Sequence, residues 1–138
     1  MAASAFGLAA IRPAIAAWLE ATPRQPAGPF YHPMEPLSVD NDLLYHQDPE
    51  SLADGEVIYI RGRLLDQTGK PIKDARIEIW QANAYGRYNH PRHANSNLPL
   101  DTNFFGFGNT LTGPEGHYRF RSIKPAPYSD NLEWLRPP

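Results

Sequence analysis

Short apolar runs separated by turn sequences fill the chain from Gly55 to Ile123, and no helical pattern lies between them. This succession restricts the fold to an antiparallel β architecture, because strands joined by short turns pair with their sequence neighbours. The 138 residues include 15 Pro and 10 Gly, a content that suits many short strands and turns. We therefore predict an all-β fold, an antiparallel β-sandwich.

Turn chemistry and side-chain alternation set the predicted strand boundaries. Asp66–Pro71 and Gly113–Gly116 are turn sequences rich in glycine and proline. Apolar and polar residues alternate in the second predicted strand, which places Ile77 and Ile79 on one face. The predicted strands are Val57–Leu65, Ala75–Gln81, Asn109–Thr112 and His117–Ile123.

The first 54 residues differ in composition from the strand region. Residues 1–20 are apolar and rich in alanine, so we predict a short helix; the alternative is the remnant of an export signal, although no basic region precedes it. Residues 21–54 form a long irregular arm whose aromatic residues suggest that it lies on another surface. We divide the chain into the helix and arm, 1–54, and the N-terminal part of the sandwich, 55–138, and expect a homo-oligomer formed through the arm.

Charge and residue content exclude several classes of function. The formal net charge is −2 and there is no Lys/Arg run, so we expect no nucleic-acid partner. The absence of cysteine excludes disulfides, thiolate zinc sites and cysteine nucleophiles. No stretch approaches the roughly 20 apolar residues of a membrane span. We expect a cytoplasmic protein, or an exported one if residues 1–17 are a signal remnant.

Two tyrosines, Tyr88 and Tyr128, stand in loop-like segments flanked by strand patterns. A tyrosine in a sandwich usually packs in the core or makes a corner hydrogen bond. A pair of phenolates, however, is a donor set that suits a hard ferric ion. His90 and His93 share a proline-containing loop, where histidines are more often solvated than metal-bound. From these residues alone, core packing and metal binding both stay open.

The glycine turns and alternating strands are common to many β-sandwich proteins, but three other stretches of the sequence are more specific to one family. They are Trp80-Gln-Ala-Asn83, Gly86-Arg-Tyr88 and Lys124-Pro-Ala-Pro-Tyr128. Through them the chain resembles the intradiol ring-cleaving dioxygenases, ferric enzymes that open catechol and protocatechuate rings. The likeness covers residues 22–138 and includes the arm. The other matching stretches are Thr22–Tyr31, Gly62–Pro71, Leu100–Phe104 and Gly116–Phe120.

The resemblance implies a site in which two tyrosines and two histidines hold Fe(III). Tyr88 matches the first tyrosine, and Tyr128 matches the axial tyrosine that leaves the iron when substrate binds. Arg136 matches an arginine implied to stabilise charge on the substrate during catalysis. Gly28 and Pro29 match a segment implied to line the substrate pocket.

The implied reaction opens a catechol, of the protocatechuate kind, between its two hydroxylated carbons. The partners are the aromatic diol and O₂, and the product is a cis,cis-muconate-type diacid. Fe(III) stabilises phenolates, and a catechol that binds as a dianion would displace a hydroxide and Tyr128, which accept its two protons. The sequence leaves the identity of the catechol open.

The sequence departs from the family pattern after Arg136-Pro137-Pro138, where the resemblance implies a His-x-His ligand pair. We expect the 138 residues to be the N-terminal portion of a longer enzyme, in which they supply two of the four protein ligands. Alone, they are expected to have no dioxygenase activity and low solubility. A replacement role for His90 or His93 stays open. The alternatives are a non-catalytic transthyretin-like or carboxypeptidase-regulatory-like module and a pseudoenzyme subunit.

Overall fold

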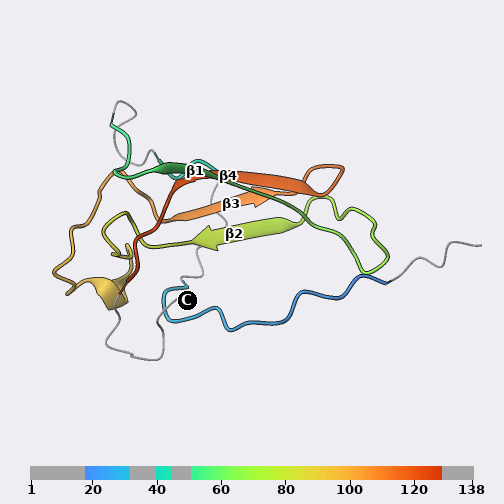
Figure 1. Ribbon diagram of the computed structural model, residues 1–138, viewed down its shortest axis with the longest axis horizontal. Helices are drawn as coiled ribbons and strands as arrows, with labels where there is room; N and C mark the ends of the chain where they lie inside the picture. Colours follow the sequence, from blue (N-terminus) through green and yellow to red (C-terminus); the bar gives the residue numbers. More distant parts are fainter. Residues whose placement is uncertain (1–17, 32–39, 45–50, 129–138) are drawn as a thin grey trace, which may run out of the picture.

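A computed structural model describes residues 18–31, 40–44 and 51–128 (Figure 1). All four predicted strands are present, and the last has the predicted bounds. No helix in the described part of the chain is long and apolar enough to cross a membrane. The elements in chain order are β1 (Val57–Arg63), β2 (Arg76–Trp80), the short 3₁₀ helix η1 (Pro91–His93), β3 (Phe107–Leu111) and β4 (His117–Ile123).

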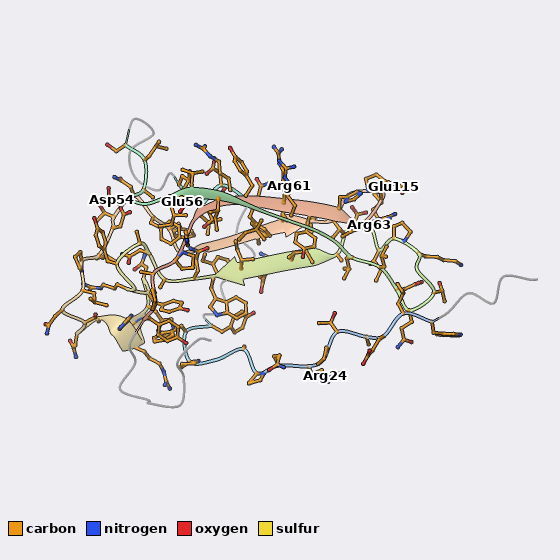
Figure 2. The ribbon with its side chains drawn as sticks, in the orientation of Figure 1. Arg24, Asp54, Glu56, Arg61, Arg63 and Glu115 are labelled. Atoms are coloured by element: carbon orange, nitrogen blue, oxygen red, sulfur yellow. The ribbon has the colours of Figure 1, made fainter. Side chains whose placement is uncertain are left out.

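The strands form two antiparallel pairs. β1 pairs with β4, with Val57 opposite Ile123, and β2 pairs with β3, with Trp80 opposite Phe107. Arg61 projects from the outer face of β1, away from β2 (Figure 2). The two pairs run along the long axis of the molecule (Figure 1), and the predicted antiparallel β-sandwich class is confirmed.

The segment Asp40–Leu44 joins the two sheets at their edges. The backbone N–H of Asn109 in β3 donates to the carbonyl oxygen of Asp40 at 2.9 Å. The backbone N–H of Arg121 in β4 donates to the carbonyl oxygen of Asn41, also at 2.9 Å. A sheet edge with unpaired backbone groups invites pairing with another chain. This part of the arm therefore satisfies edge groups on both sheets.

The hydrophobic core lies between the sheets. Phe120 faces inward, as the alternation in β4 predicts, and is fully buried. Leu43 and Leu44 of the arm are also buried, so the division at residue 54 separates two parts that share one core. Burial of such a side chain contributes about 1.5–3 kcal/mol. The buried core residues are Leu43, Leu44, Ala53, Phe104, Phe120 and Ile123.

The first described segment, residues 18–31, contains the start of the arm and runs along the outer side of β2 (Figure 1). At its C-terminal end, the hydroxyl of Tyr31 donates to Glu78 Oε2 at 3.0 Å. The ring of Tyr31 also contacts that of Trp80, with centroids 4.7 Å apart. The expectation that the arm's aromatic residues lie on another surface is confirmed at this position.

The predicted N-terminal helix falls mostly outside the described residues, which begin at Trp18. Residues 18–20 are irregular and exposed. The backbone N–H of Leu19 donates to the carbonyl oxygen of Gln67 at 2.8 Å, which fixes the residues just before the arm to the turn after β1.

Candidate metal centre

The loop that carries Tyr88 leaves the end of β2 and is organised by the buried side chain of Asn83. Asn83 Oδ1 accepts the backbone N–H groups of Tyr85 at 3.0 Å and Arg87 at 2.9 Å. Asn83 Nδ2 donates to the carbonyl oxygen of Pro99 at 2.9 Å. Asparagine side chains favour turns because they bond to backbone groups a few residues on. The position of Tyr88 is thereby fixed relative to β2.

The segment that carries Tyr128 packs directly against this loop. The backbone N–H of Ala126 donates to the carbonyl oxygen of Asn83 at 3.2 Å. Gly86 has a φ of +82°, and a Cβ at this position would overlap the carbonyl oxygen of Pro127. Only glycine allows both this conformation and this close approach. The two tyrosine-bearing segments therefore touch through their backbones.

The predicted ligand tyrosines, Tyr88 and Tyr128, are brought together. Their ring centroids lie 5.1 Å apart and their planes are inclined by 86°. Burial, and to a smaller extent the nearby Tyr128, together raise the pKa of the Tyr88 phenol from 10.0 to about 12. Burial and a neighbouring group of like charge both disfavour a phenolate. Without a cation, the Tyr88 hydroxyl therefore holds its proton at neutral pH.

Phe30 of the arm completes an aromatic cluster around the two phenols. It is buried and stacks on Tyr88, with ring centroids 4.2 Å apart, and it meets Tyr128 edge-on at 5.5 Å. η1, the end of the arm and the segment after β4 converge at this end of the molecule (Figure 1). The sequence predicts that Phe30, as an aromatic residue of the arm, lies on another surface, and this is confirmed. That this surface is the phenol pair was not predicted.

His90 and His93 lie beside the phenols, but the Nδ1 atom of each accepts a hydrogen bond from a backbone N–H. His93 Nδ1 accepts the backbone N–H of Tyr88 at 3.0 Å, and His90 Nδ1 accepts that of Arg92 at 3.1 Å. In a neutral imidazole, an accepting Nδ1 leaves the ring proton on Nε2. A metal ion bound at Nδ1 would replace the hydrogen bond to the backbone N–H. A metal ion bound at Nε2 would displace the ring proton from that nitrogen. These contacts favour a structural role for both histidines.

The donor chemistry of the phenol pair fits a hard trivalent cation. Such a cation stabilises phenolates, and it would offset both the burial and the charge repulsion that keep Tyr88 protonated. Within the described ranges, no cluster of three or more His, Cys, Asp or Glu residues could hold a metal ion. Of the predicted ferric ligands, the described residues include the two phenols, Tyr88 and Tyr128.

A cavity of about 220 Å³ opens beside Tyr88 and extends toward β2 and β3. Ligand sites in proteins are mostly apolar hollows with a few polar groups. Of the predicted pocket residues, Pro29 is half-buried and Gly28 exposed, directly before the lining residue Phe30, and Arg136 lies outside the described residues. The walls include Phe30, Trp80, Tyr88, Asn89, His90 and Phe105.

Comparisons with known proteins assign the family. A family model described as dioxygenase matches residues 27–133. The chain belongs to the intradiol dioxygenase family. It is 41% identical over 105 residues to the protocatechuate 3,4-dioxygenase beta chain of Burkholderia cepacia, covering 76% of this chain and 44% of that relative. It is 33% identical over 108 residues to the catechol 1,2-dioxygenase of Acinetobacter baylyi, covering 78% of this chain and 32% of that one.

Solved structures of intradiol dioxygenases share the fold. The 3-chlorocatechol 1,2-dioxygenase of Rhodococcus opacus aligns with a TM-score of 0.56 at 32% identity, over 75% of this chain and 38% of that one. The chain thus spans less than half the length of these relatives. The predicted family is confirmed, and its members are ring-cleavage enzymes. The roles of the individual site residues stay predictions.

Proposed function

We propose that the protein is a ferric intradiol dioxygenase that opens a catechol ring of the protocatechuate kind with O₂. The observation that carries the proposal is the edge-on approach of Tyr88 and Tyr128, with ring centroids 5.1 Å apart at one end of the sandwich. The beta chain relative named above acts on protocatechuate by its name, which supports this substrate class. The product is a ring-opened diacid that contains both atoms of O₂.

Tyr88 and Tyr128 would hold the ion, with further ligands supplied from outside the described residues. When bound, Fe(III) would supply Lewis acidity that favours phenolate and catecholate oxygens and activates the ring toward O₂. Tyr88, packed under Phe30, is the fixed phenol. Tyr128 would be the exchangeable phenol and would accept one proton from the incoming diol.

The cavity beside Tyr88 orients the substrate ring. Its aromatic walls, Trp80 and Phe105 among them, favour a flat apolar ring, and Asn89 adds a polar side chain at its margin. Phe30 is buried against the two half-buried phenols and shields part of their surface from water, which strengthens charge interactions there. We propose that Arg136 stabilises negative charge on the bound diol and that Gly28 and Pro29 border its entry.

The test is to load the purified protein with Fe(III) and record its visible spectrum. A phenolate-to-Fe(III) charge-transfer band is expected, and it should fall in both Tyr88→Phe and Tyr128→Phe. Tyr59→Phe is the matched control, since Tyr59 lies exposed on β1. A colourless protein, or a band that survives both site substitutions, contradicts the proposal.

Turnover is tested separately with protocatechuate and catechol under labelled O₂, in protein that carries all four expected iron ligands, because we expect no activity from these 138 residues alone. Both labelled oxygen atoms should appear in the diacid product. Incorporation of label from water into both positions would exclude dioxygenase chemistry.

A further inference from the structure

We infer that Asn83 is a positioning residue that sets the separation of the Tyr88 and Tyr128 phenols, an inference that rests on the proposed ferric site. Its contacts reach both tyrosine-bearing segments. The side chain is almost fully buried, with 2% exposed, and its hydrogen bonds go to backbone groups of Tyr85, Arg87 and Pro99. Its action on the metal centre is therefore indirect.

On the Tyr88 side, Asn83 closes the turn that runs to Arg87. The backbone N–H of Asn83 donates to the carbonyl oxygen of Arg87 at 2.9 Å, and its carbonyl accepts the N–H of Gly86 at 3.1 Å. Asn83 Oδ1 accepts the N–H groups of Tyr85 and Arg87. One residue thus makes four hydrogen bonds within the turn that directly precedes Tyr88.

On the Tyr128 side, the same carbonyl of Asn83 accepts the N–H of Ala126 at 3.2 Å. Ala126 stands two residues before Tyr128, between Pro125 and Pro127. Proline fixes φ and has no N–H, so Ala126 provides the only backbone donor of these three residues. A shift of the Asn83 carbonyl is therefore transmitted to Tyr128 through a stiff segment.

A third contact holds Asn83 itself in place. Asn83 Nδ2 donates to the carbonyl oxygen of Pro99, and the Arg87 guanidinium donates to the neighbouring carbonyl of Leu98 at 2.8 Å. The amide of asparagine is suited to this position because it offers an acceptor and a donor without charge. Alanine offers neither, and ionised aspartate offers only the acceptor.

Metal binding makes this geometry consequential. Protein oxygen ligands bind transition metals at about 2 Å, so both phenol oxygens must reach a common point within a few tenths of an ångström. Residues that orient metal ligands typically change metal affinity by about 10–100-fold when substituted. Asn83 fits that class because its hydrogen bonds tie the two phenol-bearing backbones together.

The experiment measures iron affinity and the visible band per bound Fe(III) in Asn83→Ala, Asn83→Ser and Asn83→Asp. We expect about tenfold weaker iron binding and a shifted or weakened band in the alanine variant. The serine variant retains one oxygen and should be intermediate. The aspartate variant keeps both acceptor bonds and should recover most of the wild-type band.

Thr112→Val is the matched control for a merely structural effect. Thr112 is equally buried, and its hydroxyl also bonds two backbone groups, accepting from Ala75 and donating to Ile72. It lies beyond the end of β3, at the opposite end of the sandwich from η1. The control should lose stability but keep the wild-type band and iron affinity.

Amide hydrogen exchange of Tyr85 and Arg87 reports the loop without iron. Exchange at both amides should accelerate in Asn83→Ala and stay slow in Asn83→Asp. A wild-type band and affinity in the alanine and serine variants would overturn the inference. If the alanine variant does not fold, the serine variant alone decides. Absence of a band in the wild-type protein would instead sink the proposed ferric site.

Discussion

The ring of Phe30 stacks on the ring of Tyr88, with planes inclined by only 11°. Phe30 belongs to the arm and Tyr88 to the loop after β2, so the stack ties the arm to the candidate metal centre. Stacked aromatic pairs contribute about 0.5–1.5 kcal/mol beyond the burial of their surface. The arm is therefore one wall of the centre.

Phe30→Ala should lower the free energy of unfolding by about 3 kcal/mol, because it removes a buried ring and leaves a cavity beside Tyr88. Urea denaturation measures this loss. Leu19→Ala is the control in the same described segment, just before the arm, since Leu19 is exposed and its backbone hydrogen bond survives. It should change stability by less than about 0.5 kcal/mol. Equal losses in the two variants would contradict the packing role of Phe30.

The metal-free protein should lose stability in alkali through Tyr88. Its folded pKa is raised from 10.0 to about 12, so the neutral phenol stabilises the fold fully below pH 10, and this contribution is lost as pH rises to 12. The loss is roughly 2 kcal/mol after allowance for partial solvent screening. Unfolding free energies of wild type and Tyr88→Phe across this range provide the measurement. Parallel curves for the two proteins would refute the assignment.

Acid should weaken the turn after β1 through Asp66. Its pKa is lowered from 3.8, first by the hydrogen bond from the Thr68 hydroxyl and then by the backbone N–H of Lys70. The stabilisation is therefore present above pH 3.8 and lost as pH falls through the lower folded pKa. Urea unfolding at neutral and acid pH should show a shallower pH dependence in Asp66→Asn. If the unfolding free energy of Asp66→Asn depends on pH as steeply as that of the wild type, Asp66 does not stabilise the turn.

Two glycines allow the contact between the tyrosine segments to be tested against a matched site. Gly86→Ala and Gly116→Ala both place a Cβ on a residue with positive φ, near 80°, and against a backbone carbonyl, that of Pro127 or Leu64. Both variants should lose stability, by at least about 1 kcal/mol. Only Gly86→Ala should weaken the Fe(III) band. The carbonyl that its Cβ would meet, that of Pro127, belongs to the segment of Tyr128, whereas that of Leu64 does not. A weakened band in both would show that general destabilisation suffices.

The strands could be predicted because their signals are local. Alternation in β4 and the glycine turns around it define each strand within a few residues along the chain. The pairing of Tyr88 with Tyr128 came from the family resemblance, since neither sequence neighbourhood specifies the other.

The long-range contacts could not be predicted from the sequence, because no periodic pattern encodes a contact between distant segments. The stack of Phe30 on Tyr88 and the edge pairing of Asp40–Leu44 join segments far apart in the chain. The sequence marks the Trp80-Gln-Ala-Asn83 stretch as specific but does not show why. The reason is physical: Gln81 Nε2 donates to the carbonyl oxygen of Ile123 at 2.9 Å, and Asn83 binds the segment just beyond.

The edge segment Asp40–Leu44 also has a consequence for the order of folding. Its ion pair from Asp42 to Arg121 joins residues 79 positions apart, and Leu43 and Leu44 enter the core only when β4 is in place. Contacts of such long sequence separation form slowly, because a large loop must close first. During synthesis, Leu43 and Leu44 therefore stay exposed until β4 has been made. Assembly of the aromatic cluster, which needs Tyr128 beyond β4, is then a late event in the life of the nascent chain.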